Sequence, residues 1–358
     1  MPRPNGKMLA ARLHGPRDFR IDQLPHPGTP GPGEALIRVT AVGICGSDLH
    51  IFADGRIGDA AVESPMVLGH EFAGVVEAVG PDAQDGFGRK LAPRTRVAVD
   101  PATSCGRCEM CERGDPNLCL NLHFCGTPPD EGCLCEYIKM PARNCFPVPD
   151  SIDDETAVML EPFGIALHTI DLSRIRVGST VAVIGAGTIG LCILEAAKLA
   201  GAAQVFITEK LDWRIAVAKK LGGSTVNIEK EDPVKAVMKA TGGRGVDVAI
   251  EAAWADESVQ QAADMVRRGG VLVLVGIPSE DKLLLKASGV RRRGLTIQMV
   301  RRMKITYPRA IELAKRNLID MKAIVSHRVA FKDIVKAYEM NAAYKDRVVK
   351  VIVNMNVK

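Results

Sequence analysis

The sequence predicts an α/β protein in which a doubly wound parallel-sheet domain is inserted into a second, mostly β domain. Three observations predict this architecture. The chain has 358 residues, which is more than one hydrophobic core usually supports. Short β-branched runs separated by Gly and Pro fill the N-terminal part, and from Val177 strands alternate with helical patterns. The C-terminal part returns to mixed helix and strand, so we expect the sheet domain to interrupt the other domain.

The N-terminal part predicts the strands of the mostly β domain. Its apolar runs are short and alternate with turn residues, as in irregular β domains. A closing apolar run at residues 348–353 is predicted to complete the same domain. We therefore expect this domain to cover residues 1–162 and 301–358. Its other predicted strands are residues 35–39, 72–76 and 96–99.

The middle of the chain predicts a parallel sheet with crossover helices. Continuous apolar runs are typical of strands that are buried on both faces, and the segments between them have helical spacing. We expect this domain to cover residues 163–300. Its strands are predicted at residues 179–184, 205–208, 246–250, 271–275 and 296–299, and its first helices at 189–199 and 213–221.

The charge balance argues against a nucleic-acid partner. The chain has 47 basic and 42 acidic residues, for a formal net charge of +5, whereas nucleic-acid-binding domains are usually far more basic. One dense basic cluster is present, at residues 291–293 with Arg301 and Arg302. A solvated face or an anionic ligand explains this cluster more simply than a nucleic acid.

No segment of the sequence predicts a membrane span or a secretory signal. The longest apolar run starts at Val181, contains glycines and meets Glu195 after 14 residues, which is too short to span a bilayer. The first residues have no apolar stretch behind their charge, as a signal peptide would have. Ten cysteines without such a signal are typical of a reducing compartment, so we expect a cytoplasmic protein without a membrane partner.

A run of four cysteines predicts a structural metal site. Two residues between neighbouring cysteines let the thiolates converge on one ion, and four sulfurs close a tetrahedral shell around zinc. A closed shell leaves no position for substrate, so this zinc would fix a lobe at about residues 100–120. An iron–sulfur cluster uses similar spacings and chance clustering is the other alternative, but the loop context favours zinc. The ligands are Cys105, Cys108, Cys111 and Cys119.

A second set of metal-binding side chains lies upstream. Cys45 offers a thiolate, His70 an imidazole and Glu71 a carboxylate, and Glu161 can offer another carboxylate. Alone, each of these residues is more often a core residue or a satisfied polar group. Beside a zinc knuckle and a nucleotide fold, they predict a mixed site with one position left for water or substrate. A zinc ion there would act as a Lewis acid on an alcohol.

A glycine-rich turn predicts a dinucleotide cofactor. Residues 185–190 read Gly-Ala-Gly-Thr-Ile-Gly and join a β-branched strand to a helix, as in a Rossmann-type domain. The first glycine makes the tight turn, the second admits the pyrophosphate, and the third lets helix and strand pack closely. The helix N-terminus then faces the diphosphate. A doubly wound fold without a nucleotide is the alternative.

An acidic residue after the next strand predicts which cofactor is bound. Glu209 ends that strand, where its carboxylate would hydrogen-bond the adenosine ribose and repel a 2′-phosphate. NAD is therefore predicted over NADP, although the nearby Lys210 and Arg214 soften this preference. The predicted cofactor-binding residues are Gly185, Gly187, Thr188, Ile189, Gly190, Glu209, Lys210 and Arg214.

Together these motifs resemble the medium-chain, zinc-containing alcohol dehydrogenase superfamily, and most closely its sorbitol (polyol) dehydrogenase branch. The resemblance covers essentially the whole chain and implies a GroES-like fold for the mostly β domain. The zinc ligands, the cysteine lobe and the glycine turn occur in the family's order and spacing. The branch signals are residues 55–58, 126–132 and 160–162.

The resemblance also implies residue roles. Counterparts of Cys45, His70 and Glu71 hold the catalytic zinc in that branch, and the counterpart of Glu161 either ligates it or contacts its water. Two zinc ions per chain follow, one catalytic and one structural.

Further roles concern proton transfer and the substrate. Ser47 would hydrogen-bond the substrate hydroxyl and pass on its proton, and His50 would complete a relay to solvent. Arg302 falls where the branch has a substrate-contacting arginine. Two departures are visible: animal-type sorbitol dehydrogenases carry a tyrosine where Ile51 stands, and they lack the cysteine lobe. The missing phenol weakens the case for sorbitol itself.

We therefore predict reversible, NAD-linked oxidation of a secondary alcohol on a small polyol, sugar or cyclitol to the ketone. Threonine and simple secondary-alcohol dehydrogenases share the zinc ligands and remain alternatives. A catalytically silent NAD-binding protein or a zinc-free quinone reductase is less favoured, because the open ligand set would have no purpose in either. Relatives pair through the last strand of the nucleotide sheet, near residues 295–300, so a homotetramer or homodimer is expected.

Overall fold

The computed structural model describes residues 6–253, 255, 257–278 and 282–356. Its contacts divide the chain into two compact units, which are described separately below. Unit 1 holds residues 1–161, 307–316 and 325–358, and unit 2 holds residues 162–306 and 317–324. Two segments that the sequence analysis assigns to the mostly β domain, 301–306 and 317–324, group with unit 2, and the predicted domain limits stay predictions.

Unit 1 is built on a seven-stranded sheet with the order β12-β8-β7-β3-β20-β19, in which β11 also pairs with β3. The central strand β3 is buried along most of its length, so apolar residues can point to both faces. A separate three-stranded sheet has the order β2-β1-β6. The strands are β1 (Lys7–Gly15), β2 (Asp18–Pro25), β3 (Glu34–Gly43), β4 (Arg56–Ile57), β5 (Ala60–Ala61), β6 (Met66–Val67), β7 (Glu71–Val79), β8 (Arg96–Val99), β9 (Ala102–Thr103), β10 (His123–Phe124), β11 (Tyr137–Pro141), β12 (Cys145–Pro147), β19 (Val325–Ala330) and β20 (Lys350–Asn354).

Few helices accompany these strands. Among them, α1 and α10 pack against each other, and three aromatic rings (Phe19, Phe52 and Tyr338) meet beside them in the core, with centroids 4.6–6.2 Å apart. The predicted strands of the mostly β domain are confirmed as β3, β7, β8 and β20. The helices are α1 (Gly46–Asp54), α2 (Glu109–Glu112), α9 (Tyr307–Lys315) and α10 (Ile334–Ala342).

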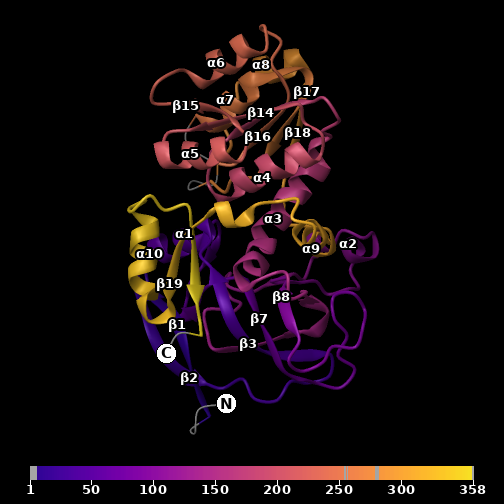
Figure 1. The fold of residues 1–358 in the computed structure, drawn as a ribbon, viewed down its shortest axis with the longest axis vertical. Helices are drawn as coiled ribbons and strands as arrows, with labels where there is room; N and C mark the ends of the chain where they lie inside the picture. Colours follow the sequence, from indigo (N-terminus) through magenta and orange to yellow (C-terminus); the bar gives the residue numbers. More distant parts are fainter. Residues whose placement is uncertain (1–5, 254, 256, 279–281, 357–358) are drawn as a thin grey trace. The chain divides into compact units, whose positions relative to one another are not determined.

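Unit 2 is a doubly wound parallel sheet, as the sequence predicts. Its strand order is β15-β14-β13-β16-β17-β18, the arrangement of dinucleotide-binding folds. Helices α4 and α5 cover one side of the sheet and α6 and α7 the other (Figure 1). The strands are β13 (Thr180–Ile184), β14 (Gln204–Glu209), β15 (Ser224–Asn227), β16 (Val246–Glu251), β17 (Val266–Leu274) and β18 (Thr296–Met299). The helices are α4 (Thr188–Leu199), α5 (Asp212–Lys220), α6 (Pro233–Ala240), α7 (Ser258–Met265) and α8 (Ala287–Arg293).

A long helix that the sequence analysis does not predict, α3 (Asp154–Ser173), contains Pro162 in its interior. A proline has no N–H, so the helix lacks one hydrogen bond there. The division between the units falls at this point, between Glu161 and Pro162.

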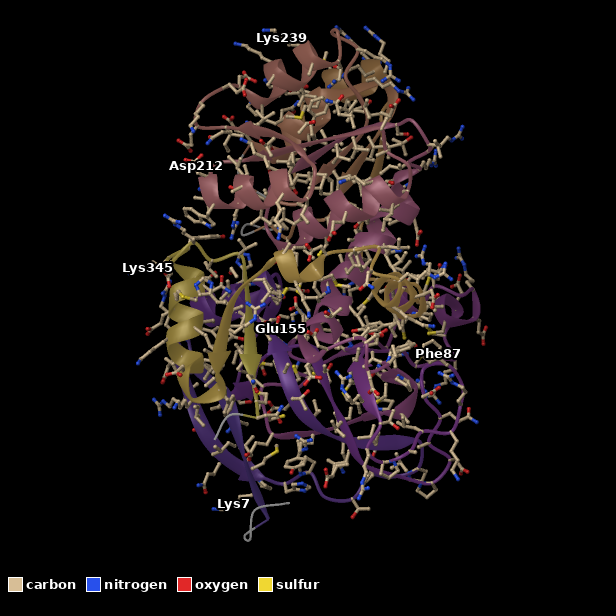
Figure 2. All side chains as sticks on the ribbon, viewed as in Figure 1. Lys7, Phe87, Glu155, Asp212, Lys239 and Lys345 are labelled. Atoms are coloured by element: carbon tan, nitrogen blue, oxygen red, sulfur yellow. The ribbon has the colours of Figure 1, made fainter. Side chains whose placement is uncertain are left out.

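Most charged side chains lie on the outside of each unit, as the labelled Lys7 and Lys239 illustrate (Figure 2). The long apolar run that starts at Val181 forms β13 and most of α4, so it is part of a buried core. None of the described helices combines the length and the apolar character that crossing a membrane requires.

A partly buried carboxylate, Asp247, joins three strands of unit 2 at their amino ends. One oxygen of Asp247 accepts hydrogen bonds from the N–H and hydroxyl of Thr180, each at 2.9 Å. The other oxygen accepts from Arg244 and Arg267, each at 2.6 Å. Partial burial raises the pKa of Asp247, but these hydrogen bonds outweigh it and hold that pKa well below its ordinary value.

We expect Asp247→Asn to destabilise the protein by about 1–3 kcal/mol, because charged hydrogen bonds are lost. A lowered pKa in the folded state gives stability that is present above the unfolded pKa of about 4 and is lost as the pH falls below it. The difference between wild type and variant should therefore shrink below about pH 4. Urea unfolding at several pH values measures it. Asp264→Asn, whose carboxylate is 42% exposed, is the control, and an equal loss there would contradict the prediction.

Candidate active site and metal sites

Three side chains from the N-terminal half converge in unit 1. Donor atoms of Cys45, His70 and Glu71 all lie within 4.8 Å of one another. His70 and Glu71 are buried, with 5% and 1% of their surface exposed, whereas Cys45 is half-buried. A thiolate, an imidazole and a carboxylate at this separation fit a single zinc ion, whose ligands lie about 2.0–2.3 Å from the metal.

The pairing of β3 with β7 brings these residues together. Gly43 at the end of β3 pairs with Glu71 at the start of β7, and the chain then turns into α1, with Cys45 as the N-cap residue. His70 directly precedes β7 and therefore lies beside Cys45. A side chain at Gly43 would overlap the Glu71 carboxylate, so the close approach of the two strands requires glycine there.

Asp48 supports two of the ligands and was missed by the sequence analysis. This carboxylate is fully buried. One oxygen accepts the backbone N–H of Cys45 at 2.9 Å, and the other lies 3.2 Å from Nδ1 of His70. A carboxylate on one ring nitrogen orients the imidazole and leaves the other nitrogen for a metal. The spacing Cys-x2-Asp in the helix start was the signal that could have identified it.

The charges around His70 prepare the site for a cation. Burial lowers the pKa of His70, but the negative charges of Asp48 and Cys45 outweigh burial and raise that pKa well above its ordinary value. The same negative charges would favour a metal cation at this imidazole, whose ligating nitrogen must be deprotonated.

Lys350 is a second residue that the sequence analysis missed. It lies on β20 with 1% exposure, forms an ion pair with Glu71, and donates to the carbonyl oxygen of Ile44 at 3.1 Å. Its ammonium group therefore offsets the charge of Glu71 inside the core. In the sequence, Lys350 is the one lysine within the apolar run 348–353. This could have indicated a buried ion pair, because a buried lysine without a partner is rare.

Glu161 lies near the three ligands but is not in the mutually close group. It lies in α3 with 4% exposure. Burial raises the pKa of Glu161 to about 8, and the charge of Glu71 adds to this, while His70 and Lys350 act in the opposite direction. A carboxyl group with such a pKa can hold or release a proton near neutral pH.

Helix α1 places the two predicted proton-transfer residues. Ser47 and His50 are half-buried and three residues apart, so they share one face of the helix. Ile51 is 1% exposed and belongs to the apolar core of unit 1. The position that carries tyrosine in animal-type relatives therefore serves packing in this chain.

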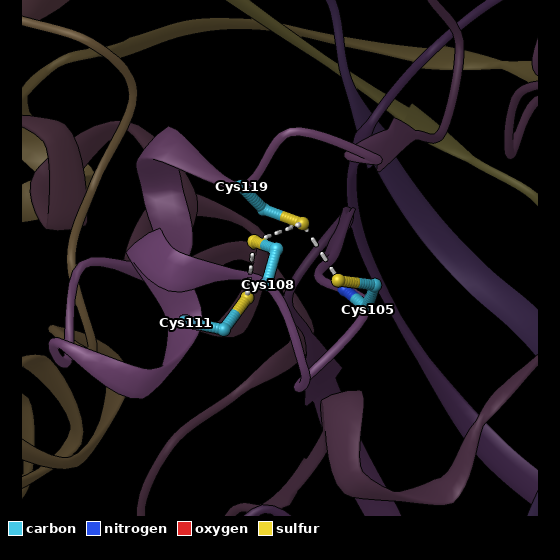
Figure 3. A group of neighbouring side chains, drawn as sticks. All are labelled: Cys105, Cys108, Cys111 and Cys119. Carbon is cyan, nitrogen blue, oxygen red and sulfur yellow. Dashed lines mark hydrogen bonds between the residues drawn. The ribbon is translucent and has the colours of Figure 1, made fainter.

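The four-cysteine group forms the second candidate metal site. All four sulfurs lie within 4.8 Å of one another, and Cys108 is 3.6 Å from Cys111 and 3.8 Å from Cys119 (Figure 3). Four sulfurs at about 2.3 Å from one tetrahedral zinc stand about 3.8 Å apart, whereas a disulfide is about 2.05 Å long. The spacing therefore fits a single ion better than a disulfide or a multi-iron cluster.

Backbone N–H groups support this knuckle. Those of Cys105 and Asn121 point to the sulfur of Cys119 at 3.2 and 3.4 Å. A hydrogen bond from the backbone of Arg107 lowers the pKa of Cys105 to about 6, so this thiol ionises readily. The cysteines outside the two sites are all buried; they are Cys125, Cys133, Cys135, Cys145 and Cys192.

The glycine turn of unit 2 has the geometry that its motif predicts. It joins β13 to α4, and Gly187 is the N-cap residue of α4. A side chain at Gly190 would overlap the carbonyl oxygen of Gly185, so the helix can pack this closely only with glycine. Thr188 and Ile189 form the first turn of α4, and the N-terminus of a helix is a favourable place for a diphosphate.

Glu209 lies at the end of β14 and is 8% exposed. Its carboxylate accepts the backbone N–H of Lys210 at 2.7 Å and that of Ala186 at 3.1 Å. The guanidinium group of Arg214 lies 3.8 Å away. The carboxylate therefore joins the loop after β14 to the glycine turn.

Arg302 lies in unit 2, between β18 and α9, and is half-buried with a left-handed backbone (φ 54°). The three zinc-ligand candidates lie in unit 1, so the predicted substrate contact of Arg302 stays a prediction.

Comparisons with known proteins agree with this geometry. Residues 31–150 match the family model of the alcohol dehydrogenase GroES-like domain, and residues 188–316 match that of the zinc-binding dehydrogenase. The chain is similar to sorbitol dehydrogenase from Bacillus subtilis (strain 168), with 38% identity over 350 residues that cover 98% of each chain.

Two solved structures are similar over 98% of this chain. An alcohol dehydrogenase from Escherichia coli CFT073 in complex with NADH has 30% identity, a TM-score of 0.87 and coverage of 100% of its own chain. A zinc-binding dehydrogenase from Sinorhizobium meliloti 1021 bound to NADP has 31% identity, a TM-score of 0.88 and coverage of 99%. The predicted combination of a GroES-like domain with a Rossmann-type domain is confirmed.

We expect Cys108→Ser to remove one metal ion and to lower stability, because structural zinc contributes folding free energy. Metal analysis by mass spectrometry should fall from about two zinc ions per chain to about one, and the melting temperature should fall with it. Cys192→Ala, which changes a buried thiol outside both groups, is the control. Unchanged metal content in Cys108→Ser would contradict the assignment.

We expect Lys350→Met to destabilise the protein by about 3–5 kcal/mol, because it leaves a buried carboxylate without its counter-charge. Added zinc should raise the melting temperature of this variant more than that of the metal-free wild type, since the ion supplies the missing positive charge. Thermal unfolding with and without zinc measures both effects. The exposed Lys332→Met is the control, and equal behaviour of the two variants would contradict the prediction.

Proposed function

We propose that this chain, which belongs to the medium-chain, zinc-containing alcohol dehydrogenase superfamily and to its sorbitol and polyol branch, oxidises a secondary alcohol of a polyol-like substrate with NAD. The product would be the ketone, and the reaction would be reversible. The convergence of Cys45, His70 and Glu71 within 4.8 Å carries this proposal, because these three ligand types leave a coordination position for substrate.

The chain's own residues supply binding and proton transfer. When bound, zinc supplies Lewis acidity toward the alcohol oxygen and NAD accepts the hydride. Cys45, His70 and Glu71 would hold the zinc, and Glu161 would either ligate it or contact its water. Ser47 would hydrogen-bond the substrate hydroxyl and pass on its own proton as it takes that of the substrate.

Two further residues are proposed to act in proton transfer and in substrate binding. His50, on the same face of α1 as Ser47, would carry the proton onward. Arg302 would contact the substrate's further hydroxyl groups.

The surroundings of Glu209 support NAD over NADP. Its buried carboxylate would repel a 2′-phosphate, and the neighbouring charge of Arg214 is already opposed by this carboxylate at 3.8 Å. Lys210 lies beside the same position. One of the similar solved structures contains NADH and another contains NADP. We therefore attribute the preference for NAD over NADP to these side chains and not to the fold.

The sorbitol dehydrogenase relatives favour a polyol over threonine or a simple secondary alcohol. Ile51 in place of tyrosine favours a polyol other than sorbitol. We further propose that the chain binds a small-molecule substrate and two zinc ions. It would form a homotetramer or homodimer in which the chains pair through the edge strand β18. The apolar residues Ile297 and Met299 on this strand are 36% and 57% exposed, which supports such a pairing.

A panel of polyols, cyclitols, threonine and simple secondary alcohols tests the proposal by NAD reduction. We expect turnover with a polyol or cyclitol and at least about tenfold lower kcat/KM with NADP, a difference of about 1.4 kcal/mol. Cys45→Ser should lose turnover and one zinc ion while it keeps NADH binding, measured by fluorescence titration. Cys192→Ala should keep all three. A Cys45→Ser variant that keeps full activity, or that loses NADH binding as well, would sink the site assignment.

A further inference from the structure

A polar hollow of about 460 Å³ opens in unit 2, away from the glycine turn. The loop between α3 and β13 forms one wall, and the amino ends of β16, β17 and β18 form the others. The glycine turn follows the carboxyl end of β13, so the two places are separated by the length of that strand, about 15 Å. A ligand in the hollow therefore would not compete with the dinucleotide.

The lining of this hollow is strongly basic. Four arginines line it, together with one acidic residue and Thr296; the arginines are Arg174, Arg176, Arg244 and Arg267. The acidic residue is Asp247, and hydrogen bonds from Thr180, Arg244 and Arg267 already engage both of its oxygens. Its single charge cannot balance four guanidinium groups.

Arg174 and Arg176 carry the unbalanced charge. Both are exposed, and no acidic side chain among the described residues forms an ion pair with either of them. Guanidinium groups form paired hydrogen bonds with phosphate oxygens, and several arginines around one hollow are typical of phosphate recognition.

The shape and composition of the hollow narrow the class of ligand. Its volume lies within the range of small-molecule sites, about 300–1,000 Å³. No aromatic side chain lines it, so a nucleotide base would have no ring to stack on. We propose that this hollow binds a small, non-aromatic polyphosphate anion of the pyrophosphate class.

A rival explanation assigns these arginines a purely structural role. Arg174 and Arg176 directly follow the C-terminus of α3, where positive charge stabilises a helix. In that case the wild type would not bind pyrophosphate, or the variant without these arginines would bind it equally well, and the variant would only be less stable.

The test is a calorimetric titration of the NADH-saturated, zinc-loaded enzyme with inorganic pyrophosphate at about 0.1 M salt. NADH saturation blocks the glycine turn, which could otherwise accept the probe. We expect one saturable site per chain in the wild type. The double variant Arg174→Gly/Arg176→Ser should bind at least about tenfold more weakly. Glycine is chosen because Arg174 has a left-handed backbone (φ 59°), which glycine adopts without strain.

The matched control removes two arginines outside the lining, Arg291→Ser/Arg292→Ser in α8. It has the same net charge as the test variant, so it should bind pyrophosphate like the wild type. Melting temperature and NADH affinity show that each variant is folded. If the double variant fails to fold, Thr296→Glu adds a carboxylate to the lining and should weaken binding as well.

Three results would overturn the proposal. The first is that the wild type shows no saturable binding of pyrophosphate. The second is that the control variant loses as much pyrophosphate affinity as the test variant, because the attraction would then come from the overall charge; the third is that folded variants of the lining keep the wild-type affinity.

Discussion

The antiparallel pairing of β3 with β7 is the constraint on which the candidate active site depends. The register that sets Gly43 opposite Glu71 joins the end of one strand to the start of the other. This places a thiolate, an imidazole and a carboxylate in one small volume. Most of that volume is buried, so each charge needs a partner from another element. Asp48 and Lys350 provide these partners, and the core around them can then exclude water.

The two candidate metal sites differ in how their negatively charged ligands are stabilised. The cysteine knuckle is partly exposed, and backbone N–H groups of its own loop point to the sulfur of Cys119. The site at Cys45 is stabilised by two buried charged side chains, Asp48 at the start of α1 and Lys350 on the distant strand β20. Four cysteine ligands from one loop are typical of a structural metal site. A buried set of ligands with charged neighbours is better suited to catalysis, because the low dielectric constant of the protein interior strengthens electrostatic interactions.

Motifs with local spacing were predictable from the sequence. The glycine turn, the cysteine knuckle and the buried strands of unit 2 each depend on residues close in sequence, and all of these elements are present in the structure. Contacts between distant segments were not predictable in the same way. Lys350 could be suspected as a lone charge in an apolar strand, but its partner Glu71 could not be identified without the topology. Helix α3 was missed because Pro162 usually signals a helix end, and here packing overrides that preference.

The ion pair between Glu71 and Lys350 joins residues 279 positions apart. A ribosome adds about 5–20 residues per second, so about 15–55 s separate the synthesis of the carboxylate from that of its lysine. During this interval β3 lacks its neighbour β20, and Glu71 has no buried counter-charge. The core of unit 1 therefore cannot close around Glu71 until β20 has been synthesised. A chain that lacked β20 would leave β3 without this neighbour and Glu71 without its ammonium partner.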